Sequence, residues 1–378
     1  MKILFCSPVQ KSKELGGSKV VVELAEAMQQ IGWDCQTVCP SDFPAPSGKV
    51  TQNKVFHEQL RAHLLKHADN FDVIDYDHSY LPFARKEFSP HPLFVARSVL
   101  LTHHLLSIPV PKSSGLRAVA GILIKGNTRR REMETLVRNS QKTIKEADLV
   151  NVSNFDDKAE LIKNDISADK IVVIPYGIST ARRILFDQIS SQVPKQPVIA
   201  FVGTFDYRKG AKEFPEIVHQ ITEAIPNVRF RLLGAQGLFR TEAEILSRFP
   251  RGLRERVEVV LRYKSDELPQ LLSDCALGIF PSYIEGMPFG VLEMLAASMP
   301  VIAYDSPGPP MMLPAEYLVP RGDTQKMSEK VITLLRNESS LQNARIWAKQ
   351  QSQQFCWQEI AKTTAAVYQD QLRNRRCI

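Results

Sequence analysis

The stretch CALGIFPSYIEGMPFGVLEMLAASMPVIAYDS, residues 275–306, decides the fold class of this 378-residue chain. A short apolar run, 275–281, leads through a loop rich in Gly and Pro into an apolar helix, and a second apolar run follows at 300–306. A strand, a helix and a second strand, all apolar, form the repeating unit of a parallel sheet that is covered on both faces. We place the start of the helix at Val291, because Pro288 and Gly290 disfavour a helix before it.

The same alternation runs along the whole chain. Six strand-like runs precede the polar stretch DQISSQVPKQP, residues 187–197, and six follow it: 2–8, 34–40, 71–77, 93–99, 148–154 and 170–177, then 198–203, 229–235, 257–263, 275–281, 300–306 and 316–320. The pattern predicts an α/β fold of two doubly wound, Rossmann-like domains facing a cleft. We expect them at residues 1–180 and 195–355, joined near 180–197, with a helix in 356–378 packing back on the first.

Composition narrows the class of protein. With 44% hydrophobic and 24% charged residues the chain has the make-up of a soluble globular protein. The apolar start MKILFCSPV is too short for a secretory signal, and no run approaches the roughly 18 apolar residues of a membrane span. Six cysteines lack a CxxC pair or metal-ligand spacing. We therefore expect a cytoplasmic protein without a disulfide or a metal.

Basic residues concentrate in one segment of a chain whose net charge is +7. Between residues 112 and 145 they are Lys112, Arg117, Lys125, Arg129, Arg130, Arg131, Arg138, Lys142 and Lys145. Leu116, Val119, Ala120 and Leu123 have helical spacing beside them. Two interpretations stay open: a helix docked on its own domain, and a helix on an anionic membrane surface, to which Arg375 and Arg376 would add. Interleaved aromatic residues are missing, so we expect no nucleic-acid partner.

Ligands of open α/β sheets bind where the strands end, so residues just after strands are candidates for a site. Gly16 and Gly17 follow the first strand and open a helix, where backbone N–H groups could approach an anion or a sugar. Neither GxGxxG nor GxxxxGK[ST] occurs, which disfavours an NAD enzyme and a P-loop NTPase. In VGTFDYRKG, Arg208 and Lys209 follow the strand 198–203 and could grip a diphosphate.

The segment 284–298 completes the candidate site. The N–H groups at Gly290 to Leu292, at a helix start, would hold phosphate oxygens. Glu293 is an acceptor for two vicinal hydroxyls, as on a ribose, and Glu285 could accept hydrogen bonds from a second sugar. Two carboxylates beside an anion-binding helix start predict a site for a nucleotide sugar. Each alone has a simpler explanation: Glu293 could be an acid that stabilises the helix dipole, and Glu285 a solvated acid of a loop.

SYIEGMPFGVLEMLAASMPVIAYD resembles the E-x7-E segment of retaining glycosyltransferases of family four, which have the two-domain GT-B fold. VGTFDYRKG is similar to the phosphate-gripping loop of that family, and LGGSKVVVELAEAMQQIGW to its N-terminal glycine loop. EADLVNVSNF, VVIPYGI and the helix after Trp357 match in order and spacing, so the resemblance covers almost the whole chain.

The resemblance implies roles for individual residues. Glu293 would bind the donor ribose, Glu285 the hydroxyls of the transferred sugar, and the amides of Phe289, Gly290, Val291 and Leu292 the sugar and diphosphate. Lys209 matches the lysine of the family. Thr204 stands where the family has an arginine, so we assign that role to Arg208. A donor-contacting histidine of the N-terminal domain corresponds to His104, or to its neighbour His103.

The same resemblance implies a metal-independent transfer with retention of anomeric configuration. Asp75-x-Asp77 looks like the metal-binding motif of the other main glycosyltransferase fold, but Asp75 belongs to a strand of the first domain, and Arg208 and Lys209 already supply positive charge. We expect a nucleotide-diphosphate sugar as co-substrate, UDP being the commonest nucleotide, no other cofactor, and a glycan or lipid-linked acceptor at the inner membrane face. A UDP-sugar epimerase and a degenerate, binding-only scaffold stay open as alternatives.

Overall fold

The computed structural model describes residues 1–13, 16–45, 52–79, 83–107 and 116–376, with the backbone alone at 52–54, 107, 116–129 and 376. Contacts divide this part of the chain into two compact units. Unit 1 contains 1–107, 116–176 and 357–376, and unit 2 contains 177–356. The polar stretch 187–197, which we expected to join the domains, therefore lies inside unit 2. It is held there because Arg345 and Gln342 donate hydrogen bonds to the carbonyl of Ser191.

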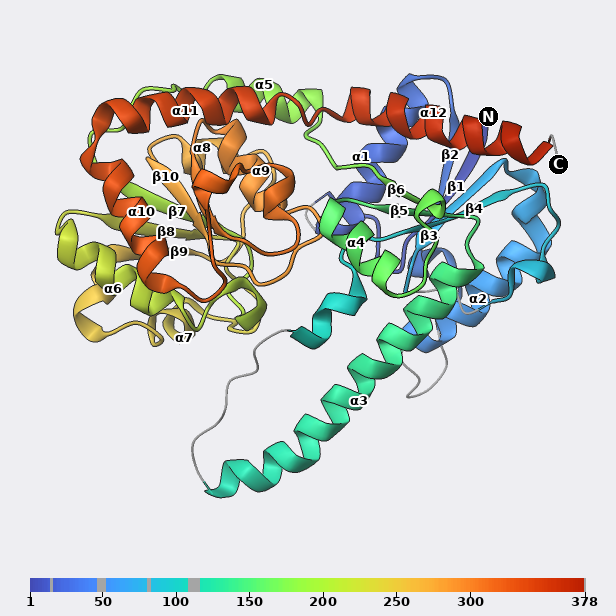
Figure 1. Cartoon of the computed structure of the whole chain (residues 1–378), viewed down its shortest axis with the longest axis horizontal. Helices are drawn as coiled ribbons and strands as arrows, with labels where there is room; N and C mark the ends of the chain where they lie inside the picture. The colour runs from blue at the N-terminus through green and yellow to red at the C-terminus, as the bar shows by residue number, and fades with distance from the viewer. Residues whose placement is uncertain (14–15, 46–51, 80–82, 108–115, 377–378) are drawn as a thin grey trace. The chain divides into compact units, whose positions relative to one another are not determined.

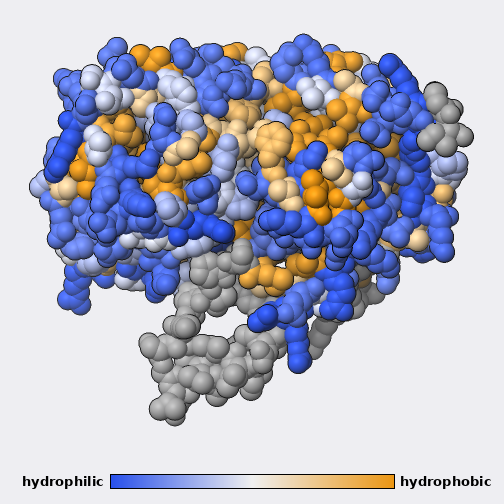
Figure 2. All heavy atoms as spheres, viewed as in Figure 1, coloured by the Kyte–Doolittle hydropathy of each residue, from blue (hydrophilic) through white to orange (hydrophobic). Residues whose placement is uncertain are grey.

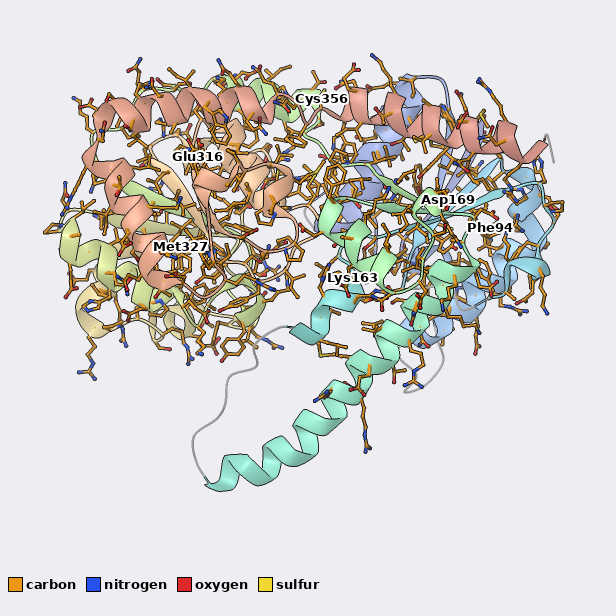
Figure 3. All side chains as sticks on the ribbon, viewed as in Figure 1. Phe94, Lys163, Asp169, Glu316, Met327 and Cys356 are labelled. Carbon is orange, nitrogen blue, oxygen red and sulfur yellow. The ribbon has the colours of Figure 1, made fainter. Side chains whose placement is uncertain are left out.

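Unit 1 is built on a parallel sheet with the strand order β2-β1-β3-β4-β5-β6 (Figure 1). Its strands are β1 Lys2–Cys6, β2 Asp34–Val38, β3 Val73–Asp77, β4 Leu93–Arg97, β5 Leu149–Val152 and β6 Ile171–Val173. Its helices are α1 Gly16–Gln30, α2 Gln52–His67, α3 Leu116–Glu146, α4 Phe155–Lys163 and α12 Trp357–Arg376, with the 3-10 turn η4 Thr102–Ser107. Every residue of β4 is buried, as a strand covered on both faces requires, and Phe94 marks its position in Figure 3.

Helix α12 belongs to unit 1 although it comes last in the chain, and specific polar contacts hold it there. The indole Nε1 of Trp357 donates to Glu23 of α1 over 2.6 Å. The hydroxyl of Tyr368 lies 2.6 Å from Asp75 of β3, which is also paired with Arg97 of β4. All of these side chains are buried, so their polar groups must be satisfied by one another.

The basic segment forms most of the long helix α3. Lys112 and the side chains of Leu116, Arg117, Val119, Ala120, Leu123, Lys125 and Arg129 lie outside the described residues. From Arg130 onward the described basic side chains are exposed, whereas Ser140, Thr143 and Ile144 are buried against unit 1. The carboxyl-terminal turns of α3 therefore dock on their own unit, as one of the two interpretations predicts for the helix.

Unit 2 is built on a second parallel sheet, with the order β12-β11-β10-β7-β8-β9. Its strands are β7 Val198–Val202, β8 Arg229–Leu233, β9 Val257–Val260, β10 Leu277–Phe280, β11 Val301–Tyr304 and β12 Leu318–Val319. Its helices are α5 Thr180–Asp187, α6 Phe214–Ala224, α7 Glu242–Leu246, α8 Leu268–Leu272, α9 Phe289–Ala296, α10 Thr324–Arg336 and α11 Glu338–Ser352, with the 3-10 turn η6 Tyr207–Lys209. Met327 of α10 is fully buried (Figure 3).

The twelve predicted strands are confirmed, and the pairs between them are parallel in both sheets. The predicted helix start at Val291 is wrong by two residues, because α9 begins at Phe289 with Pro288 as its N-cap. Hydrophilic residues cover most of the face shown in Figure 2, which fits helices that turn their apolar sides to the sheets. Among the described residues, no helix has both the length and the apolarity needed to cross a membrane.

Candidate functional site

The candidate site of unit 2 lies at the point where the strand order of its sheet reverses. Strands β7 and β10 are neighbours, yet they are the first and fourth strands of the unit along the chain. The loop after β7 carries Arg208 and Lys209, and the loop after β10 carries Glu285. Since both strands are parallel, both loops leave the same edge of the sheet, at the position where doubly wound folds bind their ligands.

The structure brings these three predicted residues into one charged cluster. A carboxylate oxygen of Glu285, Oε1, lies 2.7 Å from Nζ of Lys209 and 3.0 Å from Nη1 of Arg208. The hydroxyl of Ser282 donates to the same oxygen over 2.5 Å. The ammonium of Lys209 also lies 4.8 Å from the centre of the Phe280 ring. From the sequence we assigned the two cations to a diphosphate and Glu285 to the hydroxyls of a sugar. In the structure these three side chains contact one another.

Burial and mutual attraction shape the electrostatics of this cluster. The side chains of Lys209 and Glu285 are only 12% and 9% exposed. Burial acts to raise the pKa of Glu285, but the nearby charges of Lys209 and Arg208 prevail and hold it below its ordinary value. Burial disfavours the charged form of Lys209 too and lowers its pKa, although the carboxylate of Glu285 acts to raise it. The cluster therefore carries one more positive than negative group, which suits an anionic ligand.

Backbone constraints fix the two loops against each other. Gly210, directly after Lys209, has φ +83°, and a Cβ there would lie 2.4 Å from the carbonyl oxygen of Pro281. The N–H of Tyr283 donates to the carbonyl of Arg208 over 2.8 Å, and the carboxylate of Asp206 caps η6 by accepting from the N–H of Lys209. A glycine is required at 210 because no other residue combines this conformation with this approach.

Helix α9 starts beside the same strand end. A Cβ on Gly290 would lie 2.3 Å from the carbonyl oxygen of Val202, and one on Gly203 would lie 3.6 Å from Nζ of Lys209. The start of α9 therefore packs against Val202, the last residue of β7, and Lys209 lies beside the next residue, Gly203. The expectation of exposed amides at 290–292 needs correction, since Val291 and Leu292 both donate to the carbonyl of Pro288. The prediction for the amides of Phe289 and Gly290 is untested.

Glu293 lies in the second turn of α9 and not in the first, as the sequence suggested, because the helix begins earlier. It is 5% exposed, and its Oε1 lies 2.6 Å from Nη2 of Arg182 on α5. Sequence reasoning did not identify Arg182, since a single arginine in a helix carries no signal of its partner. The structure thus places Glu293 and Glu285 on different cations.

The predicted residues of unit 1 also follow strand ends. Gly16 and Gly17 begin α1, as predicted, and a Cβ on either would meet no atom of the described part of the chain within 4 Å. His104 lies on η4 after β4, where its Nε2 is 3.0 Å from Oδ1 of Asp157. Asp157 is fully buried in the first turn of α4, and its burial raises its pKa above the ordinary value, against the effect of His104.

His103 differs from His104 in its surroundings. Its two ring nitrogens are buried, and neither has a hydrogen-bond partner among the described residues. Burial and then the neighbouring His78 lower its pKa to about 4, so the ring is neutral at pH 7. The two histidines thus differ in pairing, because His104 contacts Asp157 whereas the ring of His103 has no hydrogen-bond partner among the described residues.

The metal-like motif of unit 1 is accounted for by internal pairing. Asp75, the first acid of the metal-like motif, is 2% exposed and accepts two hydrogen bonds from Arg97, at 3.0 and 2.6 Å. Within the described residues, no group of three or more His, Cys, Asp or Glu side chains could hold a metal ion. Asp75 serves instead to join β3, β4 and α12.

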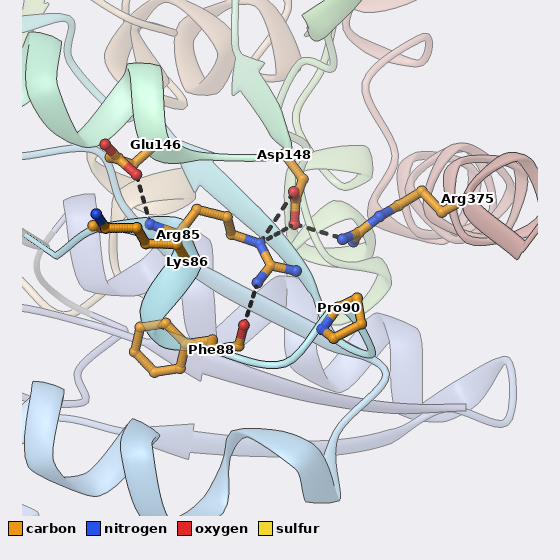
Figure 4. A pocket seen from close by; sticks show the side chains of 8 residues that line it. Arg85, Lys86, Phe88, Pro90, Glu146, Asp148 and Arg375 are labelled. Carbon is orange, nitrogen blue, oxygen red and sulfur yellow. Dashed lines mark hydrogen bonds and ion pairs between the residues drawn. The ribbon is translucent and has the colours of Figure 1, made fainter. Parts of the chain in front are cut away.

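In unit 1, a pocket of about 640 Å³ opens at the edge of the sheet where strands β4 and β5 begin (Figure 4). Asp148 accepts hydrogen bonds there from Arg85, at 3.1 and 3.0 Å, and from Arg375, at 3.1 Å. Arg85 also donates to the carbonyls of Phe88, Ser89 and Pro92. These arginines stabilise a corner of the fold, and Arg375 is therefore not the exposed surface cation that the sequence suggested.

Comparison with known proteins places this geometry in context. The family model described as "Glycosyl transferases group 1" matches residues 183–351, somewhat less than half of the chain. A component of phosphatidylinositol N-acetylglucosaminyltransferase from Arabidopsis thaliana is 25% identical over 230 residues, which are 59% of this chain and 49% of that protein. The chain thus aligns with about half the length of this relative.

Solved structures resemble the whole chain. Sucrose-phosphate synthase from Thermosynechococcus elongatus has a TM-score of 0.75 at 19% identity, covering 98% of both chains. HepE from Anabaena, in complex with UDP-glucose, has a TM-score of 0.67 at 16% identity, covering 98% of this chain and all of that one. The two parallel sheets, their helices and these likenesses identify a chain with the GT-B fold, whose residues 183–351 match the glycosyltransferase group 1 family model.

Proposed function

We propose that this protein is a retaining glycosyltransferase that moves a sugar from a nucleotide-diphosphate sugar to a glycan or lipid-linked acceptor, without a divalent metal. The observation that carries the proposal is the cluster of Arg208, Lys209 and Glu285 at the reversal point of the unit 2 sheet. It combines two cations for a diphosphate with an acceptor for sugar hydroxyls. The match of residues 183–351 to the glycosyltransferase group 1 family supports it.

The chemistry follows from where charge develops. When the bond between the anomeric carbon and the diphosphate oxygen breaks, its electrons leave with the nucleotide, and the sugar becomes cationic. Arg208 and Lys209 would stabilise the departing diphosphate, and Glu285 would orient the sugar through its hydroxyls. The acceptor oxygen bonds to the anomeric carbon on the face that the diphosphate leaves, and the acceptor proton passes to a phosphate oxygen. Glu285 holds both cations close together, at 3.0 and 2.7 Å, so little rearrangement of them is needed when the donor binds.

We assign UDP as the nucleotide and a lipid-linked molecule or a glycan as the acceptor. Support for the donor comes from HepE, whose structure contains UDP-glucose. Support for a lipid acceptor comes from the Arabidopsis relative, which is named for its action on phosphatidylinositol. Exposed Arg130, Arg131 and Arg138 on α3 would attract an anionic membrane from the cytoplasmic side. Failure to sediment with anionic liposomes at low salt would refute this membrane contact.

The decisive test is turnover of Lys209→Met with a panel of nucleotide sugars and acceptors. Removing one stabilising cation should lower kcat by about 10²- to 10³-fold and change KM little. Lys212→Met is the matched control, because Lys212 is an exposed lysine three residues further on. An unchanged kcat in Lys209→Met would contradict the role. Retained anomeric configuration in the product, and turnover that persists in EDTA, are the other expected results, whereas release of a rearranged sugar without an acceptor would indicate an epimerase.

A further inference from the structure

Glu293 and Arg182 form an ion pair inside unit 2 that is almost closed to solvent. The distance from Nη2 of Arg182 to Oε1 of Glu293 is 2.6 Å, and the two side chains are 9% and 7% exposed. The guanidinium also lies 5.7 Å from the centre of the Phe186 ring on its own helix, α5. Arg182 is thus held by α5 on one side and by the carboxylate of α9 on the other.

A buried carboxylate needs such a partner. Taking a carboxylate out of water is unfavourable unless a cation and hydrogen bonds compensate its charge. A contact of 2.6 Å with a guanidinium is a short, charge-assisted hydrogen bond, which fixes the direction of the carboxylate as well as its charge. A carboxylate has two oxygens and about four acceptor positions, so a carboxylate that pairs with a guanidinium can also accept hydrogen bonds from hydroxyl groups.

We propose that Arg182 is a positioning residue that holds Glu293 ionised and oriented to accept the ribose hydroxyls of the donor. The inference rests on the proposed function, in which Glu293 binds that ribose, and it adds a residue outside the 284–298 segment. Arg182 itself touches no ligand in this role. Its effect should therefore appear in recognition of the ribose and not in recognition of the diphosphate, which Arg208 and Lys209 would contact in the proposed function.

Isothermal calorimetry on the full chain separates these contributions, with UDP, 2′-deoxy-UDP and inorganic pyrophosphate as ligands. The unmodified chain should bind UDP at least tenfold more tightly than 2′-deoxy-UDP. In Arg182→Met we expect UDP to weaken at least tenfold, the preference for UDP to fall below about twofold, and pyrophosphate affinity to stay within twofold. Arg182→Lys, which keeps the charge but lacks the planar fork, should restore part of the preference.

Arg183→Met is the matched control. Arg183 is the next residue of α5 and donates to the carbonyls of Ser352 and Phe355, so its loss removes partly buried hydrogen bonds without touching Glu293. This variant should keep the preference for UDP.

Three results would overturn the role of Arg182. One is a full preference for UDP in Arg182→Met, and another is equal weakening of all three ligands, which would indicate general damage to the fold. If Arg182→Met does not fold, an undiminished preference in Arg182→Lys serves as the third. An unmodified chain that binds neither UDP nor GDP nor ADP would instead refute the proposed function, and the role of Arg182 with it.

Discussion

Replacing Gly290 by Ala sets two effects of known sign against each other. Gly290 is the second residue of α9, where Ala is normally the better helix former by about 1 kcal/mol. However, the new Cβ would lie 2.3 Å from the carbonyl oxygen and 3.2 Å from the carbonyl carbon of Val202. Because both are backbone atoms of β7, no side chain can move aside. Relief to an ordinary contact requires the helix to retreat by roughly 1 Å, and such overpacking costs about 1 to 3 kcal/mol.

A contact of 2.3 Å with a backbone atom places the overpacking cost in the upper part of this range. After the gain in helix propensity is subtracted, we therefore expect Gly290→Ala to destabilise unit 2 by about 1 to 2 kcal/mol. Trp347 is a suitable probe, because of the three tryptophans it alone belongs to unit 2. Labelling with 5-fluorotryptophan and following its ¹⁹F signal in urea would report this unit separately. Gly17→Ala, followed through Trp33 and Trp357 of unit 1, is the matched control, since Gly17 is the second residue of α1 and a Cβ there would meet no atom of the described residues within 4 Å.

The control should gain stability or stay unchanged, while Gly290→Ala loses it. Displacement of α9 also moves Glu293, so UDP affinity should fall together with stability. A Gly290→Ala chain as stable as the unmodified one would refute the close approach of α9 to β7 on which the site geometry depends.

Three further outcomes are expected. The pKa of His103 is about 4 in the folded chain, against an ordinary value of 6.5, so between these pH values only the unfolded chain takes up this proton. The free energy of unfolding should therefore fall by about 2 kcal/mol from pH 7 to pH 4. His103→Phe should lessen this loss in urea titrations, and an equal loss would contradict the assignment. Asp157→Asn should change the tautomer of His104, seen in its imidazole ¹⁵N shifts, because an amide can donate to Nε2 where the carboxylate accepts; unchanged shifts would argue against the pair. Arg345→Met should destabilise unit 2 by about 3 kcal/mol, because the fully buried guanidinium donates to four backbone carbonyls, including that of Cys275 at 2.8 Å. A loss of stability below about 1 kcal/mol would mean that water replaces those hydrogen bonds.

The sequence was a sufficient guide to the fold because strands of a parallel sheet are apolar on both faces and stand out from the helices between them. It also placed Arg208, Lys209 and Glu285 correctly at strand ends. It failed at the start of α9, because Pro288 and Gly290 read as helix breakers when their surroundings are unknown. In the structure Pro288 is a cap and Gly290 allows a close approach to β7.

Local pattern alone thus determined the α/β class, the twelve strands and the edge at which each candidate residue lies. Tertiary structure alone decided the partners of the charged groups: Glu285 with Lys209 and Arg208, Glu293 with Arg182, and Asp75 with Arg97. The physical reason is range. Backbone preference and hydrophobic periodicity act between residues close in sequence, whereas an ion pair such as Arg182 with Glu293 joins residues 111 positions apart, which only the completed fold brings within 2.6 Å.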